Sequence, residues 1–214
     1  MNDDFDEKVT IKQGTQEIDY GIILGNRNIV FMKAGLDGGC YGYENKYFKI
    51  ARELNSRHGC SVISASNPLG YQNDFALEMT FIRKYAQKQM LTDYEVYYFG
   101  NSNGAALGLI NAYKFPEIKK AVCINGPLTI NPHQVIRGLK GFSEEEMYLV
   151  YGSKDPSYDM LNLYSELESE KIKFVKIQGV DHNFSECPDL FSELPGILLF
   201  GDELTCKNVK IRDI

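Results

Sequence analysis

The chain has 214 residues, of which 43% are hydrophobic, and its formal net charge at pH 7 is -6. This length suits one hydrophobic core better than two, so we expect a single domain over residues 1–214. The acidic balance, without a dense Lys/Arg cluster, argues against a nucleic-acid partner. No apolar run is long enough to cross a membrane, and the acidic start MNDDFDEK is unlike a signal peptide, so we expect a cytoplasmic protein with no membrane partner.

The first predicted elements are short strands. Residues 8–13 and 17–25 form strands on either side of a turn at Gly14, and a third strand covers residues 28–35. We expect these strands to form an antiparallel lead-in. Helical spacing of apolar residues then predicts helices over 47–59, which ends at Gly59, and over 74–90, with a buried strand at 60–66 between them.

Strands and helices keep alternating through the rest of the chain. A strand at 94–100 is followed by a helix at 104–115, which Pro116 ends, and by a strand at 119–127. The alternation continues through segments 145–153, 158–169, 171–180 and 187–200. It predicts an α/β fold with a mostly parallel sheet and helices on both faces. For the polar tail 201–214, a closing strand and a loose end both stay open.

Ser102 lies where the strand at 94–100 gives way to the helix at 104–115. Gly100 and Gly104 flank it in a G-x-S-x-G pattern, and such glycines allow a very tight turn with strained backbone angles. The turn would place Ser102 at a helix N-terminus, where free N–H groups and the helix dipole favour an oxyanion. The alternative is a structural turn in which the serine is solvated or caps the helix.

A serine hydroxyl is a poor nucleophile unless a base takes its proton. The chain offers three histidines. His58 ends a predicted helix, where it would serve the helix C-terminus, and His133 lies in the connection after the strand at 119–127. His182 follows the last strong strand, so it should lie at the same carboxyl edge of the sheet as Ser102. His182 is therefore the favoured base.

A carboxylate is needed to orient that histidine. Asp155 comes directly after the strand at 145–153, and Asp159 lies four residues further on. Asp181 is adjacent to His182, and neighbouring loop residues rarely bring a carboxylate to their partner's Nδ1. Asp155 is the best placed of the three, although the segment KDPS around it also suits an ordinary turn.

Three signals in this order resemble the α/β-hydrolase superfamily: GNSNG and YGSKDP, each after a strand, and GVDHNF after the last strand. The likeness covers residues 8 to 200. It implies an α/β-hydrolase fold and a catalytic triad of Ser102 as nucleophile, Asp155 as acid and His182 as base.

The resemblance also implies an oxyanion loop, which corresponds here to VFMKAGLDGGCYG. Ala34 stands in place of the family's customary histidine. The backbone N–H groups of Leu36 and Asn103 would donate to the oxyanion, with Gly35 as the alternative to Leu36.

Larger relatives carry a helical lid after the strand that follows the nucleophile helix. Here the connection from Thr129 to Glu145 has about 17 residues, room for a loop and one short helix. We therefore expect a nearly lidless hydrolase. Short loops would shape its substrate pocket, with Gly35, Tyr41, Tyr43, Pro127, Leu128 and His133 as the candidate residues.

These residues predict a serine hydrolase that forms an acyl-enzyme on a small carboxylic ester or thioester. A peptidase or C–C bond hydrolase would use the same groups, because fold and triad do not fix the substrate. A non-catalytic binding protein with this fold is the alternative from a different class. We expect no cofactor and no metal, because the histidines are few and far apart and the five cysteines show no metal spacing. The oligomeric state stays open.

Overall fold

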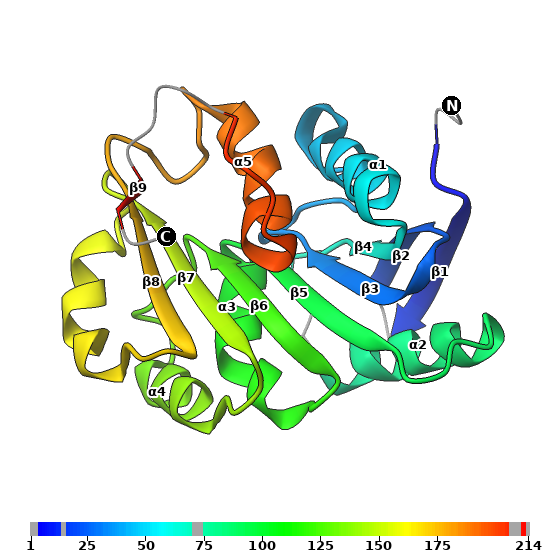
Figure 1. Ribbon diagram of the computed structural model, residues 1–214, viewed down its shortest axis with the longest axis horizontal. Helices are drawn as coiled ribbons and strands as arrows, with labels where there is room; N and C mark the ends of the chain where they lie inside the picture. Colours follow the sequence, from blue (N-terminus) through cyan, green and yellow to red (C-terminus); the bar gives the residue numbers. More distant parts are fainter. Residues whose placement is uncertain (1–3, 14–15, 70–74, 206–210, 213–214) are drawn as a thin grey trace.

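The computed structural model describes residues 4–13, 16–69, 75–205 and 211–212 of the chain. The described strands form one sheet in the order β1-β2-β4-β3-β5-β6-β7-β8-β9. Helices lie on both faces of this sheet (Figure 1). The turn expected at Gly14 lies outside the described residues.

The central part of the sheet is parallel and its two ends are antiparallel. Strand β3 pairs in parallel with β4 and β5, and the parallel pairing continues through β6, β7 and β8. Strand β1 pairs antiparallel with β2, β2 with β4, and β9 with β8. The strands are β1 Glu7–Gln13, β2 Gln16–Ile23, β3 Asn26–Lys33, β4 Cys60–Ala65, β5 Glu95–Asn101, β6 Ile118–Ile124, β7 Glu146–Gly152, β8 Ile172–Ile177 and β9 Ile211–Arg212.

The position of the third predicted strand, β3, differs from the prediction, which placed it in an antiparallel lead-in with β1 and β2. Strand β2 pairs with β4 and not with β3, so that β3 lies inside the parallel part of the sheet. The physical reason is burial: Ile29, Val30, Phe31 and Met32 are all buried, which requires helices on both faces of that strand.

Two apolar cores lie on the two faces of the sheet. Helices α1 and α5 cover one face, and α2, α3 and α4 cover the other (Figure 1). Neighbouring residues of β3 alternate between them: Phe31 faces the core under α2 and α3, and Met32 faces the core under α1 and α5. None of the helices in the described part of the chain is long and apolar enough to span a membrane. The helices are α1 Lys46–His58, α2 Phe75–Lys88, α3 Asn103–Asn111, α4 Pro132–Gly141 and α5 Pro188–Pro195.

Two helices predicted near the end of the chain are not α-helical throughout in the structure. The helix expected over 158–169 is a 3₁₀-helix at Tyr158–Leu167. The helix expected over 187–200 is α5 followed by a π-helical turn at Gly196–Phe200, and the change comes directly after Pro195, which cannot donate a backbone hydrogen bond. In the tail, β9 provides a closing strand.

The connection from Thr129 to Glu145 holds the one short helix expected there, α4. This helix packs directly on α3, the helix that follows Ser102. A Cβ atom added at Gly138 would lie 1.8 Å from the carbonyl oxygen of Leu109. The two helix backbones are therefore in contact at this point, and only glycine fits between them.

A buried ion pair lies beneath the carboxyl end of β3. Lys33, the last residue of that strand, pairs with Glu78 of α2, and both side chains are almost fully buried. The Lys33 ammonium also donates a hydrogen bond to the carbonyl oxygen of Ser66, at 2.7 Å. Burial lowers the pKa of Lys33, and the carboxylate of Glu78 opposes this by favouring the charged form. The pair thus ties the ends of β3 and β4 to helix α2.

Candidate active site

Ser102 lies in a sharp turn between β5 and α3. Its backbone angles are φ 53° and ψ −118°, which is a strained conformation for a residue other than glycine. A Cβ at Gly100 would lie 2.7 Å from the carbonyl carbon of Gly104, and one at Gly104 would lie 2.4 Å from the carbonyl oxygen of Lys33. Both glycines are therefore required by close backbone contacts. The Ser102 N–H anchors the turn by donating to Ile124, at 2.8 Å.

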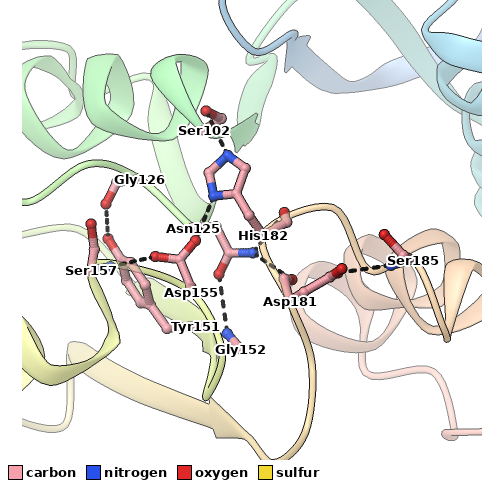
Figure 2. A network of polar contacts seen from close by, with 10 residues as sticks. All are labelled: Ser102, Asn125, Gly126, Tyr151, Gly152, Asp155, Ser157, Asp181, His182 and Ser185. Carbon is pink, nitrogen blue, oxygen red and sulfur yellow. Dashed lines mark hydrogen bonds and ion pairs between the residues drawn. The ribbon is translucent and has the colours of Figure 1, made fainter.

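The structure brings Ser102, His182 and Asp155 together in a row (Figure 2). Ser102 Oγ lies 3.1 Å from His182 Nε2, and His182 Nδ1 lies 2.5 Å from Asp155 Oδ2. With Asp155 ionised, Nδ1–H donates to the carboxylate and Nε2 is left to accept the serine proton. The three residues follow β5, β8 and β7, whose carboxyl ends share one edge of the sheet.

Asp155 is held in place by a second hydrogen bond. Its side chain is 1% exposed, whereas that of His182 is 38% exposed. While Oδ2 faces the histidine, Oδ1 accepts a hydrogen bond from the N–H of Ser157 at 2.7 Å. The turn chemistry of the segment KDPS and the contact with His182 therefore coexist, because each uses one carboxylate oxygen.

The other two aspartates make different contacts. Asp159 is exposed in the 3₁₀-helix. Asp181 accepts a hydrogen bond from the N–H of Ser185 at 2.8 Å, so its carboxylate closes a turn within its own loop. Of the three carboxylates considered from the sequence, Asp155 is the one hydrogen-bonded to His182.

The other two histidines lie elsewhere. His58 ends α1, where its Nε2 lies 3.1 Å from Asp202 Oδ2 and its ring stacks on Phe200. His133 is exposed in the first turn of α4. Neither has a described contact with Ser102, so His182 is the histidine in position to accept its proton.

Several charges act on His182. The hydrogen bond from its Nδ1–H to Asp155 raises the pKa of His182 above its ordinary value, and burial opposes this rise. The negative charges of Asp155 and Asp181 raise the pKa further, and the positive charge of Lys46 lowers it. These interactions stabilise the protonated form of His182. A side chain that holds a proton for part of a reaction needs this property.

Two asparagines that were not singled out from the sequence fasten the loops of this site. The buried Asn67 donates from Nδ2 to the carbonyl oxygen of Ala34 and to Asn103 Oδ1, each at 3.0 Å. Its backbone also exchanges hydrogen bonds with Asp37 and Gly38. Asn67 thus fixes the loop after β3 beside the first residue of α3.

Asn125 fastens the histidine loop in the same way (Figure 2). Its Nδ2 donates to the carbonyl oxygen of His182 at 2.9 Å, and its Oδ1 accepts from the N–H of Gly152 at 3.1 Å. Asn67 follows β4 and Asn125 follows β6. An asparagine within two residues of the end of an apolar strand is the sequence signal that could have identified both.

Solved structures provide the comparison for this arrangement. Est1E from Butyrivibrio proteoclasticus has a TM-score of 0.66 at 14% sequence identity, over 87% of this chain and 95% of that one. A dienelactone hydrolase from Anabaena variabilis gives 0.66 at 18%, over 90% and 95%. The thioesterase domain from the curacin biosynthetic pathway gives 0.58 at 14%, over 88% and 98%.

The chain has the α/β-hydrolase fold. This confirms the fold predicted from the order of the three sequence signals. No protein-family model and no curated protein sequence matches the chain. At such low identity the likeness concerns the fold, so the chemistry of this chain has to be argued from its own residues.

Within this α/β-hydrolase fold, the loop after β3 lies against Ser102. A Cβ at Gly35 would lie 3.3 Å from Ser102 Cβ, so the backbone of the loop is next to the serine. The carbonyl oxygen of Gly35 accepts a hydrogen bond from the N–H of Gly38 at 3.0 Å, which closes the start of this loop. The side chain of Leu36 is largely exposed, which leaves its backbone as the part that can serve the site. Asn103 begins α3, where an N–H group lacks an intrahelical partner.

The structure differs from the prediction for two of the expected pocket residues. The Tyr41 hydroxyl donates to Asp4, and its ring packs on Phe5 and Phe48, so Tyr41 faces the N-terminal segment. Leu128 is fully buried in the core on the α3 side and therefore cannot line an open pocket. Tyr41 is held by Asp4, 37 residues earlier in the chain, and Leu128 is held by burial in the apolar core.

The other expected pocket residues stay near the surface. Tyr43 is highly exposed, Pro127 and Gly35 are half-buried, and His133 is exposed. Gly35 is the one whose backbone lies directly beside Ser102. The contribution of the remaining three to a substrate pocket stays a prediction.

Proposed function

We propose that this chain is a serine hydrolase that forms an acyl-enzyme on a small carboxylic ester or thioester in the cytoplasm. The row of hydrogen-bonding groups from Ser102 through His182 to Asp155 carries this proposal. The strained turn that exposes Ser102 and the hydrolases among the proteins of similar fold support it. A peptidase or a C–C bond hydrolase would need the same groups, but the site offers no observation that favours either.

The proposed reaction begins when Ser102 Oγ attacks the substrate carbonyl carbon while His182 Nε2 takes the hydroxyl proton. Asp155 holds the imidazole in the required tautomer and stabilises its protonated form. His182 then gives the proton to the leaving alcohol or thiol, and the acyl group stays on Ser102. In the second half, His182 takes a proton from the attacking water and then gives it to Ser102 Oγ as the bond between the acyl group and Oγ breaks, which releases the acid and the free serine.

Backbone N–H groups would stabilise the negative oxygen of the tetrahedral intermediate. Asn103 supplies one donor at the start of α3, where the helix dipole adds to the effect. Leu36 supplies the other, with Gly35, whose backbone lies beside Ser102, as the alternative donor. Asn67 holds both donors in place through its bonds to Ala34 and Asn103.

Labelling with a fluorophosphonate tests the proposal directly, because this probe reacts with an activated serine and not with an ordinary hydroxyl. We expect one probe per chain, attached to Ser102 and located by peptide mass spectrometry. Ser102→Ala should abolish labelling and His182→Ala should slow it strongly. Ser185→Ala is the matched control and should label like the wild type, because the variant keeps the backbone N–H that Ser185 donates to Asp181. An unlabelled wild-type protein would favour the non-catalytic binding protein.

The pH dependence of hydrolysis gives a second test. Only a neutral imidazole can accept the serine proton, so kcat/KM should rise with pH through the pKa of His182. Because Asp155 raises that pKa, the midpoint should lie above the ordinary histidine value of about 6.5. In Asp155→Asn the residual activity should have its midpoint at a lower pH. Measurement from pH 5 to 9 with a neutral ester decides this, and a flat profile contradicts the assignment of His182 as base.

A further inference from the structure

Lys46 is the first residue of α1 and has an unusual environment. Its ammonium lies 4.5 Å from the centre of the Phe191 ring and 5.1 Å from that of Tyr47. The lysine is half-buried, and burial lowers its pKa. In the part of the chain that the structure describes, no carboxylate lies within ion-pair distance of Lys46. Two aromatic faces therefore hold a positive charge that has no anionic partner.

These two rings connect Lys46 with both sides of the candidate active site. The Tyr47 hydroxyl lies 3.5 Å from the side-chain nitrogen of Asn101, the residue before Ser102. Phe191 packs edge-on against Phe184, two residues after His182. The same ring also contacts Phe99 at the end of β5. Through Tyr47, Lys46 is connected with the turn that carries Ser102, and through Phe191 it is connected with the loop that carries His182.

This position is costly for a lysine. A cation at a helix N-terminus opposes the helix dipole, and the first turn of α1 contains no acidic residue to offset it. Partial burial adds a desolvation cost. By contrast, the half-buried Lys119 and Lys173 each contact a glutamate. An anion from outside the chain would relieve both costs at Lys46.

We propose that Lys46 binds a carboxylate of the substrate, so that the hydrolase selects esters or thioesters that carry a negative charge. This inference rests on the proposed function and names its substrate class. The ammonium would form a charge-assisted hydrogen bond with the carboxylate. The charge of Lys46 already acts on His182 across the site, which agrees with a location close to the reacting bond.

The test compares matched charged and neutral esters, one pair for each end of the substrate. For the leaving group the pair is 4-acetoxybenzoate and phenyl acetate. For the acyl group it is monophenyl adipate and phenyl hexanoate. The quantity measured is the ratio of kcat/KM for the charged ester to that for its neutral partner. We expect a ratio above one for at least one pair, and the pair concerned identifies the end that carries the carboxylate.

Substitutions then assign the preference to Lys46. Lys46→Met keeps the apolar stem and should lower the ratio by about 10- to 100-fold, the range of a hydrogen bond to a charged group. Lys46→Arg should restore much of it. Lys49→Met removes an exposed lysine from the same helix and should leave the ratio and the rates unchanged. In Lys46→Met the pH midpoint of kcat/KM should also rise, because a positive charge that lowers the pKa of His182 has been removed.

The outcomes separate this inference from the proposed function. If the wild-type protein hydrolyses the neutral esters but shows no charge preference in either pair, the inference is wrong and the proposed function stands. A preference that survives in Lys46→Met also overturns it. If the protein neither hydrolyses any of the four esters nor reacts with the fluorophosphonate, the proposed function fails and the inference falls with it.

Discussion

Replacement of Ser102 by alanine should lower kcat/KM for activated esters by about 10,000-fold or more, because the acyl-enzyme can no longer form. The fold should be retained, since Ser102 is only half-buried and its side chain has no described partner besides His182. Initial rates with p-nitrophenyl acetate, together with circular dichroism, check both parts. A variant that keeps wild-type rates would show that the nucleophile lies elsewhere.

A second substitution at this position separates strain from chemistry. Ser102→Gly should be equally inactive, but it should be more stable than Ser102→Ala in urea, by about 1 to 3 kcal/mol. Glycine adopts a φ of 53° without the steric cost that any side chain meets there. Equal stability of the two variants would mean that the turn stores no strain.

His58→Ala and His133→Ala are the matched controls for His182→Ala and should retain most activity.

Replacement of Asp155 by asparagine should lower kcat/KM by roughly 10,000-fold with little loss of structure. The asparagine amide donates to Nδ1 of His182, which moves the imidazole proton to Nε2. In that tautomer the imidazole cannot accept the proton of Ser102. The same ester assay measures the loss.

Two neighbouring aspartates control for a general effect of lost negative charge. Asp159→Asn removes an exposed carboxylate, and Asp181→Asn keeps an oxygen that can accept from the N–H of Ser185. Both variants should keep most of the activity. A larger loss in Asp181→Asn than in Asp155→Asn would reassign the acid.

The fold could be predicted because the sequence alternates between strands and helices with clear spacing. The order of strands in the sheet could not be worked out from that spacing. The sequence marks residues 28–35 as a strand, but the pairing of β2 with β4, which places β3 inside the parallel part, depends on contacts between distant segments. The π-helical turn after Pro195 likewise depends on local geometry that apolar spacing does not carry.

The three residues of the proposed triad could be named from the sequence because each follows an apolar strand. Parallel strands bring such positions to one edge of the sheet, so order along the chain becomes proximity in space. The residues that hold the triad in place were missed. Asn67 and Asn125 act through backbone atoms of loops far away in the sequence, and nothing local indicates those partners.

The sequence also could not predict which way the side chains of loop residues point. Tyr41 turns away from the site because Asp4, 37 residues earlier, accepts its hydroxyl. The ammonium of Lys46 lies over the ring of Phe191, which comes from helix α5, 145 residues further along the chain. Both orientations were decided by residues that only the folded chain brings near.

The contact between Gly138 and Leu109 has a kinetic consequence. Because the backbone of α4 rests on that of α3, the connection from Thr129 to Glu145 is packed in place against the helix that follows Ser102. No opening step should separate the arrival of substrate from the attack by Ser102, and water should reach the acyl-enzyme as soon as the leaving group departs. In the proposed reaction, water then competes with every other acyl acceptor from the start, so we expect release of free acid and little transfer of the acyl group to added alcohols.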